Sequence, residues 1–236
     1  ANAEEYADAL KLVTGDMQEL IMKAYEVLEQ IKESGVCAIV RGTSAESLCK
    51  IADALLAGGV NTIEVTFNTP GASEMIKELV AKYKDKMLIG AGTVLDAETA
   101  RTAILSGAAF VLSPSLNLGM VKMCQRYSVL PVPGIATPTE AVTAWENGVQ
   151  IIKVFPAGVF GPNYIKQLKG PLSQMEMMAV GAIDLDNFGS FLKAGACSAG
   201  IASSLVSNKL VEEGKFDEIT KRAKGFRDIF ESQKRK

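Results

Sequence analysis

Two charged residues stand inside apolar runs of the kind that form buried strands. Lys153 interrupts the run Ile151 to Phe155, and Glu64 interrupts the run Thr62 to Thr66. Burial in such a strand removes water from the Lys153 ammonium and favours the neutral amine, which is the form that attacks a carbonyl carbon. A carboxylate such as Glu64 can take and return protons in the same reaction. The pair predicts lysine-dependent aldol cleavage, in which a protonated imine accepts the electrons of the breaking bond.

Both residues also have structural explanations. A lysine near a strand end can extend its ammonium to solvent while its stem packs among apolar side chains. A lysine and a glutamate inside one domain can instead form a buried ion pair with no catalytic role. Residue type alone leaves these alternatives open.

Small residues follow three of the apolar runs. Gly90 to Thr93 permit close backbone approach and add one hydroxyl, but they lack the third glycine of a dinucleotide-binding fingerprint, so a tight turn is the simpler explanation. Val180 to Ala182 and Gly200 to Ser204 follow the last two runs. Barrels often bind phosphate at these places through backbone N–H groups, although close packing alone can also require small residues.

Composition excludes several classes of function. The chain has 236 residues, a net charge of -2 and a sequence pI near 5.4, so it lacks the basic surface that nucleic acid requires. No apolar run approaches the ~20 residues that span a bilayer, and the N-terminus is acidic, so a cytoplasmic protein is expected. Histidine is absent and the four cysteines show no CxxC spacing, so we expect neither a metal nor a cofactor.

Apolar β-type runs alternate with segments of helical periodicity from Val36 onward. The eight expected strands are Val36 to Arg41, Thr62 to Thr66, Met87 to Gly90, Phe110 to Ser113, Val129 to Val132, Ile151 to Phe155, Glu176 to Val180 and Ser198 to Ile201. The expected helices are Ala45 to Leu56, Ala72 to Tyr83, Ala97 to Leu105, Leu118 to Tyr127, Pro138 to Glu146, Pro162 to Leu168, Leu185 to Lys193 and Glu218 to Phe230. Eight such units favour a (β/α)8 barrel, and a doubly wound open sheet is the alternative.

An amphipathic helix is expected before the first strand. Asp16 and Glu19 form a start like a capping box, and apolar residues recur at helical spacing up to Ile31. We expect this helix to cover the bottom of the barrel. Residues 1–15 are interpreted as a native extension or a tag remnant, and residues 16–236 as a single aldolase-type domain.

Several motifs together resemble one enzyme family. They are Ile63-Glu64-Val65-Thr66, Gly90-Ala91-Gly92-Thr93-Val94, Ser113-Pro114, Pro133-Gly134-Ile135-Ala136-Thr137-Pro138-Thr139-Glu140 and Lys153-Val154-Phe155-Pro156. Their order and spacing over residues 20 to 230 resemble the 2-keto-3-deoxy-6-phosphogluconate (KDPG) aldolase family, which includes 4-hydroxy-2-oxoglutarate aldolase activity. The resemblance implies a (β/α)8 barrel, a homotrimer, and reversible cleavage of a keto acid to pyruvate and an aldehyde.

The resemblance also implies roles for individual residues. Lys153 would form the Schiff base and Glu64 would move protons. The implied substrate contacts are Arg41, Thr66, Asn68, Thr93, Pro114, Phe155, Gly181, Ala182 and Ser203. Within this set, Thr93 would bind the pyruvate carboxylate, Phe155 would pack beside the imine, and Gly181 with Ser203 would meet a phosphate.

Two departures from the family pattern affect the expected substrate. Many relatives have arginine where this chain has Asn68, so carboxylate recognition is expected to shift to Arg41. A common Pro-Thr-Gly-Gly segment is replaced by Ala179 to Ala182, which removes one hydroxyl from the phosphate end. The expected substrates are KDPG and 4-hydroxy-2-oxoglutarate. The alternatives are 2-keto-3-deoxy-6-phosphogalactonate, the C4 epimer, and a barrel that binds a metabolite without catalysis.

Overall fold

Nine short parallel strands form one sheet in the order β5-β4-β3-β2-β1-β9-β8-β7-β6 in the computed structural model, which describes residues 24–234. The strands are β1 (Val36–Val40), β2 (Thr62–Thr66), β3 (Leu88–Gly92), β4 (Phe110–Leu112), β5 (Leu130–Val132), β6 (Gly134–Ile135), β7 (Ile151–Val154), β8 (Glu176–Val180) and β9 (Ser198–Ile201). The two strands at the ends of this order, β5 and β6, are separated in the chain by Pro133 alone. The sheet is therefore wound into the expected (β/α)8 barrel.

The fifth barrel strand is divided, where the sequence predicted one strand at Val129 to Val132. β5 pairs with β4 on one side, while β6 pairs with β7 on the other. Proline cannot donate a backbone hydrogen bond, which limits the pairing of Pro131 and Pro133. The Pro133 carbonyl still accepts from the Lys153 N–H at 2.9 Å. This bond holds the backbone of Lys153, the candidate catalytic residue, beside the point where β5 ends and β6 begins.

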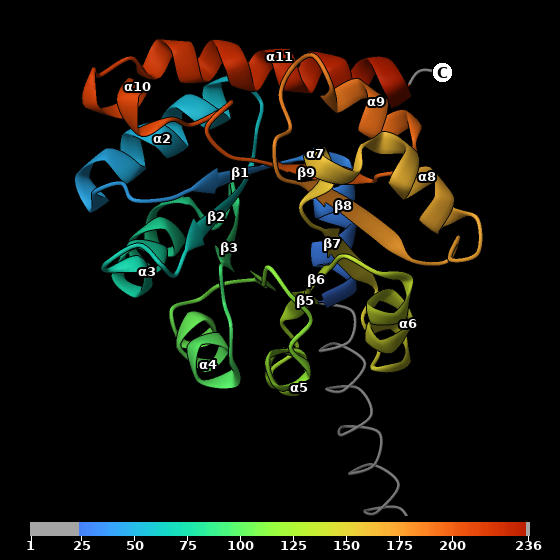
Figure 1. Ribbon diagram of the computed structural model, residues 1–236. Helices are drawn as coiled ribbons and strands as arrows, with labels where there is room; N and C mark the ends of the chain where they lie inside the picture. Colours follow the sequence, from blue (N-terminus) through green and yellow to red (C-terminus); the bar gives the residue numbers. More distant parts are fainter. Residues whose placement is uncertain (1–23, 235–236) are drawn as a thin grey trace, which may run out of the picture.

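Helices form the outer ring of the barrel (Figure 1). They are α2 (Ala45–Ala57), α3 (Ala72–Tyr83), α4 (Ala97–Leu105), α5 (Leu118–Arg126), α6 (Pro138–Glu146), α7 (Ala157–Phe160), α8 (Pro162–Lys169), α9 (Phe188–Lys193), α10 (Asn208–Glu212) and α11 (Phe216–Lys234). The short helices α7 and α10 were not predicted. The prediction was also wrong at the start of α9, because the Asp184 carboxylate accepts from the N–H groups of Asp186 and Asn187 and holds a turn there.

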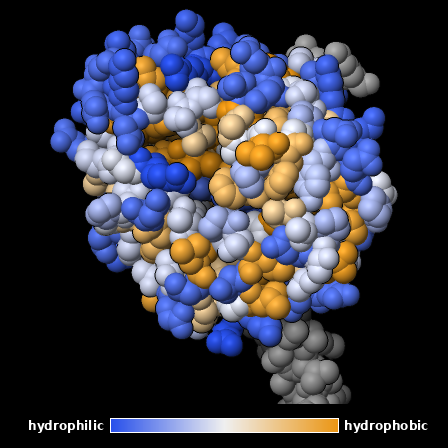
Figure 2. All heavy atoms as spheres, in the orientation of Figure 1, coloured by the Kyte–Doolittle hydropathy of each residue, from blue (hydrophilic) through white to orange (hydrophobic). Residues whose placement is uncertain are grey.

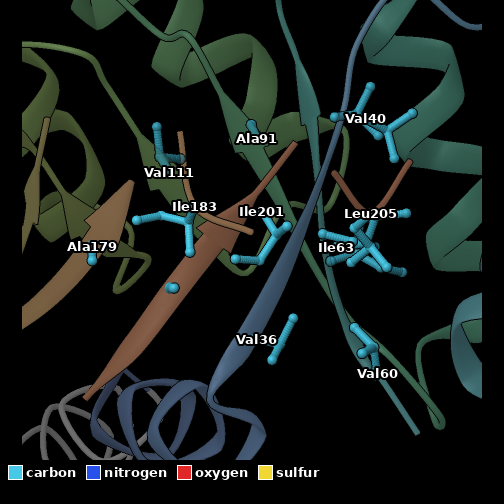
Figure 3. Packing of buried hydrophobic residues seen from close by; sticks show 14 of the residues in the cluster. Val36, Val40, Val60, Ile63, Ala91, Val111, Ala179, Ile183, Ile201 and Leu205 are labelled. Atoms are coloured by element: carbon cyan, nitrogen blue, oxygen red, sulfur yellow. The ribbon is translucent and has the colours of Figure 1, made fainter. Parts of the chain in front are cut away.

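Alternate residues of each strand pack into two different layers. In β1, Val36, Ala38 and Val40 join the cluster between strands and helices, part of which is drawn in Figure 3, whereas Cys37 and Ile39 join the cluster inside the barrel. Successive side chains of a strand point to opposite faces, which explains this division. The same parity turns Glu64 of β2 and Lys153 of β7 inward, because their neighbours Ile63, Val65, Ile152 and Val154 pack outward.

A helix at residues 24–34 covers the amino ends of the strands, as the expected amphipathic helix should. Its Val27, Leu28 and Ile31 pack into the interior cluster, and Lys32 forms an ion pair with Glu176 at 3.2 Å. In Figure 1 this helix, drawn in blue, lies behind the strands. The predicted capping residues near position 16 and the division at residue 15 lie outside the described residues. None of the helices in the described part of the chain is long and apolar enough to cross a membrane.

Candidate active site

Lys153 and Glu64 lie inside the barrel on strands from opposite parts of the sheet order. Their residues are 6% and 1% exposed. Lys153 is paired with Gly134 and with Met178, so its side chain stands between a glycine and an apolar neighbour. Its Nζ lies 5.2 Å from the centre of the Phe155 ring. This largely apolar surrounding is the environment that the sequence predicted for a reactive amine.

The Glu64 carboxyl group is buried and incompletely satisfied. Its Oε2 has no hydrogen-bond partner among the described residues, and no ion pair within 4.0 Å joins it to Lys153 there. Burial raises the pKa of Glu64 above its ordinary value of 4.5, while the positive charges of Lys153 and Arg41 act in the opposite direction. A carboxyl group of this kind can hold a proton closer to neutral pH than an exposed glutamate can.

A cavity of about 560 Å³ opens above these residues. It lies where the strands end at their carboxyl side and includes Lys153 itself. Eight of the nine predicted substrate contacts line it: Arg41, Asn68, Thr93, Pro114, Phe155, Gly181, Ala182 and Ser203. Loops after the carboxyl ends of barrel strands are where such enzymes place their active sites. The structure therefore gathers residues from seven separate segments at one opening.

Thr66, the ninth predicted contact, lies below the cavity instead of on its wall. Its hydroxyl donates to the Val40 carbonyl at 3.3 Å and is 3.2 Å from the Thr69 hydroxyl. Thr69 in turn accepts from the Gly42 N–H at 2.9 Å. Through these bonds Thr66 and Thr69 hold the loop that carries Arg41.

Two residues of the cavity wall have unusual backbone conformations. Thr93 has φ 56° and Ala182 has φ 51°, a region that residues with a Cβ rarely adopt. Such conformations cost on the order of 1–3 kcal/mol each and persist where surrounding contacts hold them. Gly158 packs against Ala182 so closely that a Cβ at Gly158 would lie 2.6 Å from the Ala182 Cβ.

The turn after β8 is held by three bonds to consecutive carbonyls. The Gly181 carbonyl accepts from the Gly158 N–H at 2.9 Å, and the Ala182 carbonyl accepts from the Asn187 side-chain amide at 2.9 Å. The Ser204 hydroxyl donates to the Ile183 carbonyl. Ser204 thereby ties the loop after β9 to the turn after β8, at the end of the cavity that contains Gly181 and Ser203.

Sequence reasoning assigned no individual role to several residues of this site. Ile39, Asp184 and Ser204 also line the cavity, and Gly92 touches the Glu64 carboxyl group. The inward direction of the Ile39 side chain could have been predicted, because successive side chains of a strand point to opposite faces. The role of Ser204 could not have been predicted, because it depends on a hydrogen bond to the carbonyl of Ile183 in a different loop. Among residues 24–234, no group of three or more acidic or cysteine side chains is placed to hold a metal ion.

Known proteins share both the sequence pattern and the fold. The family model "KDPG and KHG aldolase" matches residues 7–222. The 2-dehydro-3-deoxy-6-phosphogalactonate aldolase of Escherichia coli (strain K12) is 36% identical over 169 residues, which are 71% of this chain and 82% of the relative. The 2-dehydro-3-deoxy-phosphogluconate aldolase of Haemophilus influenzae is 34% identical over 205 residues, which are 86% of this chain and 96% of the relative.

A solved structure adds a chemical comparison. The KDPG aldolase of Legionella pneumophila, with pyruvate captured as a covalent carbinolamine, matches with a TM-score of 0.77 and 26% identity, covering 81% of this chain and 93% of that chain. The family model covers most of the chain, and both of these curated relatives are more than 30% identical over more than two thirds of it. This chain therefore belongs to the KDPG and KHG aldolase family of lyases.

Proposed function

We propose that this chain is a class I aldolase that uses Lys153 to cleave a 2-keto acid into pyruvate and an aldehyde. The observation that carries the proposal is the placement of one buried amine and one buried carboxyl group inside the barrel, below a cavity at its carboxyl end. The covalent carbinolamine in the Legionella relative supports the same type of chemistry. A barrel that binds a metabolite without catalysis would have no need for both groups.

The reaction follows from the properties of these two groups. The Lys153 amine adds to the C2 carbonyl, and loss of water gives a protonated imine. Glu64, acting through a water molecule, accepts the proton of the C4 hydroxyl, and the C3–C4 bond breaks with release of the aldehyde. The imine takes up the electrons as an enamine. Glu64 then returns a proton to C3, and hydrolysis of the imine releases pyruvate and restores the lysine.

The cavity wall supplies groups that would orient the substrate. Arg41 can bind a carboxylate with two parallel hydrogen bonds, and the Thr93 hydroxyl can add another. The Phe155 ring covers one side of the amine. Gly181 and Ser203 would place backbone N–H groups near a distal phosphate, so the substrate would extend from Lys153 toward the turns after β8 and β9.

The proposed substrates are KDPG, which gives glyceraldehyde 3-phosphate, and 4-hydroxy-2-oxoglutarate, which gives glyoxylate. The phosphogalactonate epimer is the second candidate, because the E. coli relative of that name is 36% identical. The segments Arg41-Gly42, Asn68-Thr69-Pro70 and Ala179-Val180-Gly181 also resemble that branch. Pyruvate release should be measured from the three compounds side by side at equal concentrations. Release from none of them, with folded protein, would contradict the proposed function.

We further infer that the chain assembles as a homotrimer. Figure 2 shows hydrophobic side chains among hydrophilic ones on the surface, and large apolar residues with substantial exposure include Val142, Trp145, Val159 and Phe160. The Val159 side chain is 79% exposed, which favours its burial in a contact with another subunit. Light scattering should give about three times the 25.1 kDa chain mass, and a monomer at micromolar concentration would contradict the assembly.

A further inference from the structure

We propose that Arg222, on the outer helix α11, is a positioning residue for the end of the cavity that receives the substrate phosphate. This inference rests on the proposed aldolase function. Arg222 does not line the cavity, but its guanidinium lies directly behind the loop after β9. Its Nη1 is 3.3 Å from the Ser204 carbonyl and 3.5 Å from the Ser203 carbonyl.

The Arg222 side chain is itself fixed. Its Nε donates to Glu218 Oε1 at 3.3 Å, one helical turn earlier, and its side chain is 29% exposed. The guanidinium presents several N–H donors along the edges of a rigid plane. Its Nε can therefore bind the Glu218 carboxylate while its Nη1 binds the carbonyls of Ser203 and Ser204. The ion pair with Glu218 thereby fixes the orientation in which the Arg222 guanidinium bonds to the loop after β9.

The bonds from Arg222 to the Ser203 and Ser204 carbonyls determine which backbone groups of this loop face the cavity. In a trans peptide the C=O and the following N–H lie in the peptide plane and point in opposite directions. With the Ser203 carbonyl turned toward Arg222, the Ser204 N–H points to the other side of the loop, where Ser203 and Ser204 line the cavity. An N–H group held in this direction can donate to a phosphate oxygen.

The facing turn after β8 is built in the same way. The carbonyls of Gly181 and Ala182 accept bonds from Gly158 and Asn187, neither of which lines the cavity. The N–H groups of Ala182 and Ile183 are then directed away from those donors by the same peptide geometry. Because Ser204 bonds to Ile183, the position of its loop affects both sides of the proposed phosphate contact. Arg222 is the charged side chain that holds this loop, so its loss should weaken phosphate binding without touching Lys153.

The same helix offers a matched control in Arg227. Its Nη1 donates to the carbonyls of Glu33 and Ser34, at 3.0 and 2.5 Å, and its Nη2 pairs with Glu231 one turn later. Arg227 therefore makes the same kind of contacts as Arg222. It anchors the last residues of the helix at 24–34, at the amino end of the barrel, where it cannot affect the phosphate contact directly.

The test compares KDPG with 2-keto-3-deoxygluconate, which lacks only the phosphate, in the wild type, Arg222→Met, Arg222→Lys and Arg227→Met. We expect Arg222→Met to raise the KM for the phosphorylated substrate about tenfold, with kcat and the KM of the unphosphorylated compound unchanged, since hydrogen bonds to a charged group are worth about this much. Arg222→Lys should recover part of the effect. Arg227→Met should change the two KM values equally or not at all.

Inorganic phosphate provides a readout that does not depend on turnover. Its affinity for the free protein, measured by calorimetric titration, should fall about tenfold in Arg222→Met and remain unchanged in Arg227→Met. If Arg222→Met does not fold, Glu218→Gln should show a smaller loss in the same direction, because it removes the partner that orients Arg222.

The two proposals fail in distinguishable ways. Failure of the wild type to cleave any keto acid would contradict the aldolase function, while the phosphate titration would still test the role of Arg222. Normal cleavage with an unchanged ratio of the two KM values and unchanged phosphate affinity in the Arg222 variants would overturn the role of Arg222 alone.

Discussion

Gly92 and Glu64 are packed so closely that a larger residue at position 92 would have to displace the Glu64 carboxyl group. A Cβ on Gly92 would lie 2.2 Å from Glu64 Oε1 and 2.7 Å from its Cδ. The two strands run side by side here, since Thr66 of β2 is paired with Gly92 of β3. Because Gly92 has no side chain, the Glu64 carboxyl group can occupy the space beside its Cα.

Gly92→Ala should displace the Glu64 carboxyl group and lower kcat about 10- to 100-fold, because misplacing a catalytic group by about 1 Å is enough for such a loss. Covalent capture of pyruvate by Lys153 should still occur, since the atoms nearest to a Cβ at Gly92 belong to Glu64 and not to Lys153. Gly170→Ala is the matched control, because a Cβ there meets only the Gln167 carbonyl at 3.4 Å. Normal turnover in Gly92→Ala would show that the carboxyl position is unimportant.

Glu64→Gln should keep the shape of the side chain and remove the base. We expect turnover to fall by about 10² to 10⁴, the usual range for loss of a general acid–base group. Steady-state pyruvate release at saturating substrate measures this directly. Turnover close to that of the wild type would mean that another group or water alone moves the proton.

The same variant should alter the pH dependence of stability. Burial raises the pKa of Glu64 above 4.5 in the folded state, so the folded protein holds a proton that the unfolded chain has already lost. The contribution of Glu64 to stability is therefore fully present below 4.5 and is lost as the pH rises through the higher, folded-state pKa. The Tm of Glu64→Gln minus that of the wild type should be larger at pH 7 than at pH 4. An equal difference at both pH values would contradict a raised pKa.

Val180→Thr tests the altered phosphate end. Val180 is 3% exposed and lines the cavity next to Gly181, so a threonine there would offer a hydroxyl at nearly the same volume. We expect KM for phosphorylated six-carbon substrates to fall about tenfold, as one hydrogen bond to a charged group would predict, with little change for 4-hydroxy-2-oxoglutarate. If removal of the phosphate leaves the kcat/KM of the wild type unchanged, Gly181 and Ser203 only pack, and the chain is a hydroxyoxoglutarate-type aldolase.

Much of the barrel could be predicted from the sequence because its strands are short, apolar and regularly separated. β2, β8 and β9 begin and end where expected, and Lys153 and Glu64 stood out as charges in apolar runs. Period-two alternation also implies which side chains point inward. The choice between a closed barrel and an open sheet depends on pairing between distant segments, and local periodicity carries no information about it.

Other features depend on contacts that only the folded chain reveals. The division at Pro133 reflects two different neighbours, β4 and β7, on either side of one segment. The role of Gly92 depends on the approach of Glu64 from the next strand, and that of Arg222 depends on a loop 19 residues earlier. Thr66 was expected at the substrate because of its motif, yet its hydroxyl is directed to Val40 and Thr69.

Covalent trapping of pyruvate at Lys153 tests the central claim most directly. The protein should be incubated with pyruvate and sodium borohydride, which reduces an imine to a stable amine, and its peptides should then be mapped by mass spectrometry. We expect the label on the peptide that contains Lys153 and its absence from Lys153→Met treated in the same way. Labelling at a different lysine, or none in the folded wild type, would contradict Schiff-base catalysis by Lys153.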